Sequence, residues 1–153
     1  MTVQRSAAHT QFVLQRRFAA APARVFHAWA DPVAKRRWND CHPDSSEFSL
    51  DFRVGGRELH SATLPDGRPQ VVDKVFLEIV PDERILFAYT IVVDGRPLSA
   101  SLVTVEFHVT EVGGTRLVLT EQLAYLDGHD DLEQRRHGTE EGLDRLVAQL
   151  DAP

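Results

Sequence analysis

Two residues of this chain could carry acid–base chemistry if a pocket enclosed them: His60 and Glu121. Glu121 follows Leu117 and Leu119 in an alternating segment, which predicts that all three point to the same inward face of a strand. A buried carboxylate is costly unless it is paired or neutralised. Such a carboxylate would favour the charged form of a nearby histidine, and that histidine could act as acid or base. The alternative is that His60 and Glu58 merely satisfy each other at a sheet end.

Two further alternating segments predict inward faces on which aromatic and apolar side chains gather. The residues expected to point inward are Ile85, Phe87 and Tyr89 in one segment, and Val105, Phe107 and Val109 in the next. Alternation alone does not decide the face of Glu58 and His60. With them inward, Glu58, His60, Tyr89 and Glu121 would converge in one cavity.

Nucleophilic and metal chemistry find less support. Cys41 stands beside His42, but adjacent loop residues rarely reach the geometry of a Cys–His pair, and no third, orienting residue is identifiable. The seven histidines are scattered, with no HExxH or Cys-x-x-Cys spacing. We therefore expect no metal and no other cofactor.

An ordered set of elements must position these residues. We expect a flexible lead-in at 1–10 and a single domain over 11–151, with a first strand at 11–18. Two short helices should follow, beginning at Pro22 and Pro32, and the second should end at Trp38. Repeated hairpin signals then predict a meander, for six or seven strands in all. Trp29 and Trp38, on the two short helices, are expected at a pocket entrance or in the core.

The last expected element is a helix from about Asp130 to Leu150, which carries two glycines four residues apart, Gly138 and Gly142. Each costs about 1 kcal/mol relative to alanine, and both fall on one helix face. That face is bare either because the sheet packs closely against it or because a ligand needs the room. The apolar stripe is Thr139, Leu143, Leu146, Val147 and Leu150. The charged residues 130–141 are interpreted as a solvated face.

Composition limits the classes of partner. The net charge of −6 argues against nucleic acid or an anionic membrane as partner. No apolar run approaches about 18 residues, so no membrane span is expected. One cysteine in 153 residues allows no intramolecular disulfide, and the first residues lack the apolar segment of a signal peptide. A cytoplasmic location is the default expectation.

Five stretches together resemble the START-like helix-grip fold, and within it the activator of Hsp90 ATPase homologue family of the polyketide cyclase and lipid transport superfamily. They are FAAAPARVFHAWADPVAKRRW (18–38), DFRVGGRELH (51–60), VFLEIVPDERILFAY (75–89), VTVEFHVTEVGGTRLVLTE (103–121) and HGTEEGLDRLVAQL (137–150). The resemblance implies an α+β fold in which a curved antiparallel sheet wraps around the long C-terminal helix. It also implies a cavity for a small apolar or amphipathic molecule.

The resemblance places Glu58, His60 and Ala62 on the inward face. The residues then expected to line the ligand cavity are Trp29, Trp38, Glu58, His60, Phe87, Tyr89, Phe107, Leu119, Glu121, Gly138, Thr139 and Gly142. The chain departs from the family after Trp38, where the family commonly has a second Trp and a Gly-Pro. It departs again at Thr139, where the family commonly has Trp, so we expect a wider cavity there.

Three functions remain open at this point. Binding of an apolar or amphipathic small molecule is favoured, because spacing shows no catalytic set. An enzyme of cyclase, dehydratase or hydrolase type would use His60 and Glu121 in the same cavity. A chaperone-interacting protein would need a large exposed patch, which the sequence does not reveal. A homodimer is compatible with the sequence, and nothing in the sequence requires one.

Overall fold

The computed structural model describes residues 4–39 and 46–151, so Cys41 and His42 lie outside the described residues. Seven strands form one antiparallel sheet in the order β1-β7-β6-β5-β4-β3-β2. The strands are β1 (Ala7–Phe18), β2 (Ser46–Leu50), β3 (Arg57–Thr63), β4 (Pro69–Val80), β5 (Arg84–Val93), β6 (Arg96–Val109) and β7 (Thr115–Leu126). The helices are α1 (Pro22–Ala30), α2 (Pro32–Asn39) and α3 (Leu132–Asp151).

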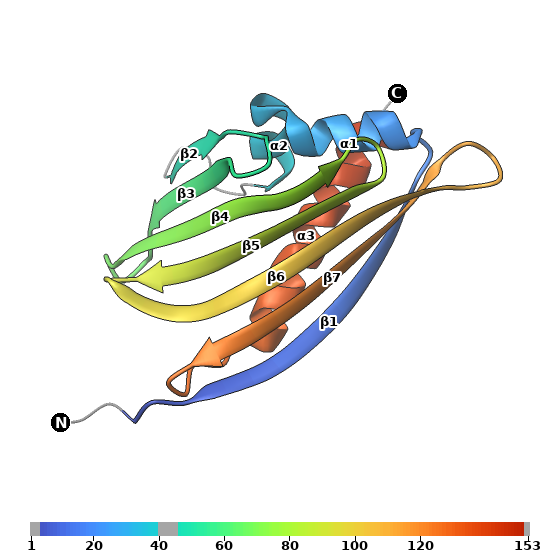
Figure 1. Cartoon of the computed structure of the whole chain (residues 1–153). Helices are drawn as coiled ribbons and strands as arrows, with labels where there is room; N and C mark the ends of the chain where they lie inside the picture. The colour runs from blue at the N-terminus through green and yellow to red at the C-terminus, as the bar shows by residue number, and fades with distance from the viewer. Residues whose placement is uncertain (1–3, 40–45, 152–153) are drawn as a thin grey trace.

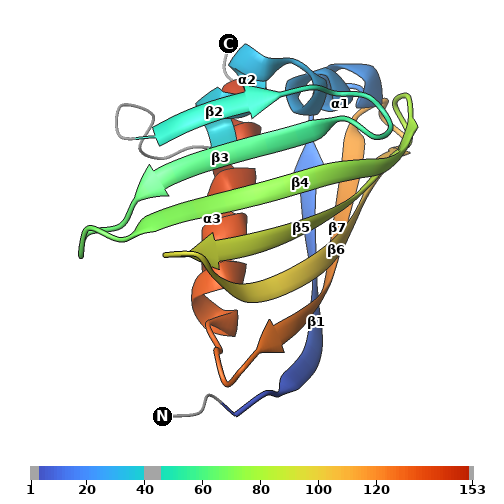
Figure 2. The ribbon, with the colours of Figure 1, turned by 60° about the vertical axis from the view of Figure 1, so that its left-hand side comes forward.

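The sheet curves around α3, and α1 and α2 cover one end of its concave side (Figures 1 and 2). This arrangement confirms the predicted α+β helix-grip architecture. The predicted start of the first strand at residue 11 was wrong, because Ala7 already pairs with Leu126. None of the helices in the described ranges is long and apolar enough to cross a membrane.

Local sequence explains the two short helices and the tightest hairpin. Pro22 occupies the first turn of α1, where its missing N–H is no loss. Asp31 ends α1 and starts α2, since its Oδ2 accepts a hydrogen bond of 2.9 Å from the Ala34 N–H. Between β5 and β6, Asp94 and Gly95 both adopt positive φ, at 51° and 76°. A two-residue turn with positive φ at both positions has a backbone twist that matches the twist of the two strands it joins.

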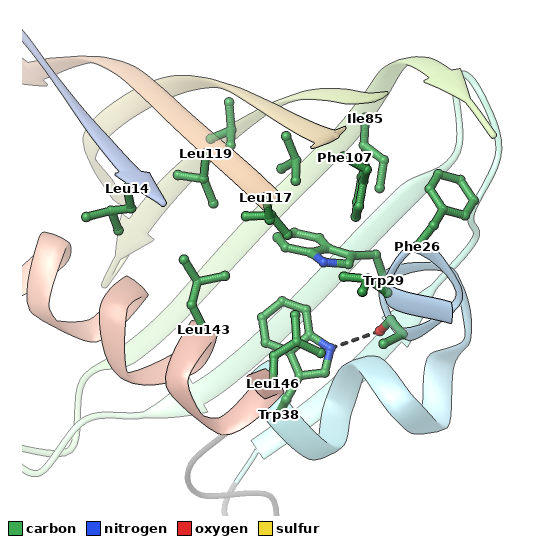
Figure 3. Packing of buried hydrophobic residues seen from close by; sticks show 14 of the residues in the cluster. Leu14, Phe26, Trp29, Trp38, Ile85, Phe107, Leu117, Leu119, Leu143 and Leu146 are labelled. Carbon is green, nitrogen blue, oxygen red and sulfur yellow. Dashed lines mark hydrogen bonds between the residues drawn. The ribbon is translucent and has the colours of Figure 1, made fainter. Parts of the chain in front are cut away.

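The hydrophobic core lies between the sheet and the C-terminal half of α3, with α1 and α2 closing its end (Figure 3). Leu143, Leu146 and Leu150 are its contribution from α3. Phe107 lies in this core, with its ring 5.5 Å from Phe26 and 6.4 Å from Trp29 between centroids. The inward prediction for Val109 was wrong: at the end of β6 it is 70% exposed.

Candidate functional site

A pocket of about 420 Å³ lies between the N-terminal half of α3 and the concave face of the sheet. It sits beside the core rather than inside it, because the apolar stripe of α3 is packed only from Leu143 onward. Ahead of that point, α3 faces the sheet with Arg135, Gly138, Thr139 and Gly142. A sheet curved around a helix leaves such a space when the helix does not fill the concavity.

The structure brings most of the sequence-predicted cavity residues to the wall of this pocket. They are Trp29, Trp38, Glu58, His60, Phe87, Tyr89, Leu119, Glu121, Gly138, Thr139 and Gly142. Phe107 is the exception, because it packs behind Trp29 against Phe26 and does not line the pocket. Whether these side chains bind a ligand stays a prediction.

The two tryptophans form the inner end of the pocket, where α1 and α2 meet the sheet. Their rings lie 4.7 Å apart between centroids, and both side chains are buried. The Trp38 Nε1–H donates a hydrogen bond of 2.9 Å to the Ala28 carbonyl, which ties α2 to α1 (Figure 3). Burial on this scale places them in the interior, not at an entrance.

A buried ion cluster of two lysines and a glutamate stands beside the tryptophans. Lys35 Nζ lies 2.9 Å from Glu58 Oε1, and Lys74 Nζ lies 2.9 Å from Glu58 Oε2. Lys35 also sits over the Trp29 ring, 4.8 Å from its centroid. Because one carboxylate faces two ammonium groups, the cluster carries a net charge of about +1 when all three are ionised.

The charges of this cluster shift its pKa values in a consistent way. Burial alone would raise the pKa of Glu58, but the charges of Lys35 and Lys74 outweigh it and lower that pKa to about 2. Burial lowers the pKa of Lys35 to about 8, because its single carboxylate partner is shared with Lys74. Glu58 is therefore a fixed negative charge and not a proton donor near neutral pH.

A second polar cluster surrounds Glu121. Its Oε2 accepts hydrogen bonds from the Tyr89 hydroxyl at 2.6 Å and the Ser101 hydroxyl at 2.9 Å. Burial and the neighbouring charge of Glu121 raise the pKa of Tyr89 above its usual value. The phenol is thus held as a hydrogen-bond donor, and Glu121 is a carboxylate whose burial is offset by hydroxyl partners.

Arg135 joins this second cluster from α3. Its Nη1 lies 3.7 Å from Glu121 Oε2, and its Nη2 lies 3.4 Å from Asp131 Oδ1. The guanidinium stands near two rings, 6.0 Å from the Tyr89 centroid and 5.2 Å from that of Tyr125. Its side chain is only 5% exposed, so the interpretation of residues 130–141 as a solvated face was wrong for Arg135.

The two acid–base candidates line the same pocket without forming one cluster. His60 is on β3 and Glu121 on β7, so β4, β5 and β6 lie between their strands. The His60 ring packs edge-on to Phe48, with centroids 6.4 Å apart. The expected convergence of Glu58, His60, Tyr89 and Glu121 is thus divided into two separate groups. A catalytic role for either candidate stays a prediction.

The two glycines of α3, Gly138 and Gly142, differ in what surrounds them. A Cβ added to Gly138 would meet nothing within 4 Å, and one added to Gly142 would meet Arg145 Nη2 at 3.7 Å and Trp38 ring atoms at 3.9 Å. Close packing therefore does not explain Gly138, and at Gly142 the contact would be ordinary. The Thr139 hydroxyl donates to the Arg135 carbonyl at 3.0 Å, so it is satisfied within the helix.

Sequence reasoning missed Lys35, Lys74 and Arg135, although each carried a signal. Lys35 precedes Trp38 by one helical turn, and Lys74 alternates with Phe76 on the inward face of β4. Arg135 precedes Thr139 by four residues, which places it on the pocket face of α3. Within residues 4–39 and 46–151, no group of three or more His, Cys, Asp or Glu is placed to hold a metal ion.

Comparison with known proteins decides the family. The model of the activator of Hsp90 ATPase homolog 1-like protein family matches residues 19–152. The chain belongs to this family. No curated protein matches it.

Solved structures of this fold include near relatives. An uncharacterised protein from Rhizobium leguminosarum is 43% identical with a TM-score of 0.91, and the match covers 98% of this chain and 99% of that one. A protein from Rhizobium loti is 44% identical with a TM-score of 0.88, over 95% and 99%. A protein of the dynemicin biosynthetic locus is 18% identical with a TM-score of 0.67, over 93% and 47%, and shares the fold alone.

Proposed function

We propose that this member of the activator of Hsp90 ATPase homologue family binds an apolar or amphipathic small molecule in the pocket beneath α3. The observation that carries the proposal is the pocket itself, which is lined on the α3 side by two residues without side chains, Gly138 and Gly142. The pocket volume of about 420 Å³ lies in the range of small-molecule sites, about 300 to 1,000 Å³.

The composition of the wall supports an amphipathic occupant. Apolar side chains from several strands and α3 line the pocket, among them Phe87, Val103, Leu119 and Leu143. The buried charged groups of the wall stand in the two clusters around Glu58 and Glu121. Apolar surface combined with a few fixed polar groups is typical of sites that bind and orient a small molecule.

An enzyme of cyclase, dehydratase or hydrolase type in the same pocket is the second candidate. The observation in its favour is the 2.6 Å hydrogen bond between Tyr89 and Glu121 at the pocket wall. Once a bound molecule is found, its turnover by Glu121→Gln and by His60→Gln tests this candidate. Turnover that survives both substitutions would exclude these residues as acid and base. A chaperone partner and a cytoplasmic location stay predictions.

The binding proposal is tested on protein purified from its own host by native mass spectrometry. We expect a retained small molecule in the wild type and its loss in Gly138→Leu, whose side chain would enter the pocket. The matched control is Ala148→Leu, a small residue at an exposed position of α3 outside the pocket. It should retain the molecule. A bound mass that survives Gly138→Leu would place the ligand elsewhere.

A further inference from the structure

The pocket wall holds buried hydrogen-bond donors that lack an acceptor. Within the part of the chain that the structure describes, Arg135 Nη1 and Trp29 Nε1 are buried with no hydrogen-bond partner. The two side chains line the pocket and are almost wholly buried, with the Arg135 side chain 5% exposed and Trp29 4% exposed. A buried donor without a partner costs stability, so an acceptor supplied by a ligand would recover that cost.

Lys74 brings a positive charge to the same wall. It shares Glu58 with Lys35, so the carboxylate is already balanced by Lys35 alone. Lys74 is the lysine of the cluster that lines the pocket, and its side chain is 13% exposed where Lys35 has 2%. The excess charge of the cluster is therefore available to an occupant of the pocket.

Lys74 and Arg135 both lie near the ring of Tyr89. Lys74 Nζ lies 5.8 Å from the Tyr89 ring centroid, and the Arg135 guanidinium carbon lies 6.0 Å from it. The carboxylate hydrogen-bonded to Tyr89 is that of Glu121, and its Oε2 already accepts from two hydroxyls. Asp131, the carboxylate on the other side of Arg135, is 26% exposed and accepts the Tyr125 hydroxyl. Lys74 and Arg135 thus stand among three carboxylates of the pocket wall, those of Glu58, Glu121 and Asp131. Glu58 is also balanced by Lys35, and Asp131 is partly exposed to solvent.

We propose that the ligand carries a carboxylate head group that lies beside Tyr89 and contacts Lys74 and Arg135, with its apolar body directed along the pocket toward Leu119. This inference rests on the proposed binding function and specifies its ligand class. Charge-assisted hydrogen bonds from lysine and arginine are the strong contacts that select such a head group. A neutral alcohol would use fewer of these donors, and an amine would meet two like charges.

Titration calorimetry at pH 7 with decanoate, 1-decanol and decylamine tests the head group, because the three probes share one chain. We expect decanoate to bind at least about tenfold more tightly than decanol. Decylamine should bind most weakly of the three. Decanol or decylamine binding as tightly as decanoate would overturn the carboxylate inference and leave the binding function intact. If none of the three binds, the proposed pocket function fails as well.

Variants of Lys74 locate the effect. Lys74→Met keeps the aliphatic stem, and we expect it to weaken decanoate about tenfold while decanol binding is unchanged. Lys74→Arg should keep the preference. Arg17→Met is the control, because Arg17 is an exposed cation on β1 outside the pocket, and its loss removes the same net charge. If Lys74→Met and Arg17→Met weakened decanoate binding equally, the result would contradict a direct contact between Lys74 and the carboxylate of the ligand. The wild-type series decides the proposal even if a variant fails to fold.

Discussion

Lys35 and Glu58 form an ion pair of 2.9 Å in the interior, and their side chains are 2% and 0% exposed. Two charges withdrawn from water this far are tolerated by the fold only while each has a partner. Their position behind the tryptophans links α2 to β3, so the pair bears on the same part of the structure as the pocket wall.

Removal of one partner should therefore be costly. We expect Lys35→Met to lower the free energy of unfolding by about 2 kcal/mol, since Glu58 loses one of its two charged hydrogen-bond partners and keeps Lys74. Denaturant unfolding at pH 7 measures this. The double variant Lys35→Met/Glu58→Leu should recover little of the loss, because it leaves Lys74 without its carboxylate partner. Arg53→Met, which breaks a pair with a 74% exposed arginine, should change little. A Lys35→Met variant as stable as the wild type would contradict the account.

The pKa of Glu58 gives a pH dependence with a definite sign. The carboxyl has a pKa of about 2 in the folded protein against an ordinary value of 4.5. The unfolded chain therefore binds a proton first as the pH falls. The contribution to stability is present above pH 4.5 and is lost between pH 4.5 and 2, by about 3 kcal/mol. Unfolding free energies measured across that range should fall more steeply in the wild type than in Glu58→Gln. Parallel profiles would show that Glu58 does not supply the slope.

Alanine at the two helix glycines should stabilise the protein. Gly142→Ala adds a Cβ at 3.9 Å from the Trp38 ring, and Gly138→Ala adds one in open space. Since neither meets a clash, each should raise the free energy of unfolding by about 0.5 to 1 kcal/mol through helix propensity. Thermal and denaturant unfolding test both variants. Destabilisation of Gly142→Ala would mean that the sheet or Trp38 packs closer to the helix than the structure shows.

Tyrosine titration probes the polar cluster around Glu121 and Arg135 without a mutation. The chain has two tyrosines, and the pKa of each is raised. Burial and the charge of Glu121 raise the pKa of Tyr89. Burial and the hydrogen bond to Asp131 raise the pKa of Tyr125. The ultraviolet absorbance of phenolate should therefore not rise near pH 10 in the folded protein. Protein unfolded in guanidinium chloride is the control and should titrate both tyrosines there. A folded-state transition near pH 10 would contradict the burial of at least one ring.

Much of the architecture could be predicted because its signals are local. Pro22 and Pro32 start their helices where expected, and alternation placed Leu117, Leu119 and Glu121 together on the inner face of β7. Alternation failed at the exposed Val109, which still pairs with β7 but lies beyond the last pair between β5 and β6. It also missed residues 7–10, because an exposed edge strand needs only backbone pairing and no apolar pattern.

The polar side of the pocket was harder to predict, since it depends on contacts between distant elements. Lys35 and Glu58 pair across α2 and β3, and nothing near either residue in the sequence marks the other as its partner. Arg135 stands in a charged segment that composition alone assigns to solvent. Its burial follows from the curvature of the sheet, which brings Tyr89 and Tyr125 to the helix. Spacing indicated the faces, but only the fold revealed the ion pairs.

Gly142 divides α3 into two segments with separate duties. Beyond it, Leu143, Leu146 and Leu150 hold the helix to the core; before it, Arg135, Gly138 and Thr139 border the pocket. Substitutions at Gly138 and Thr139 can therefore accumulate without loss of the contacts that Leu143, Leu146 and Leu150 make with the core. Such a division allows a lineage to reshape the pocket while it keeps its scaffold, and it gives protein engineers a short stretch in which to do the same.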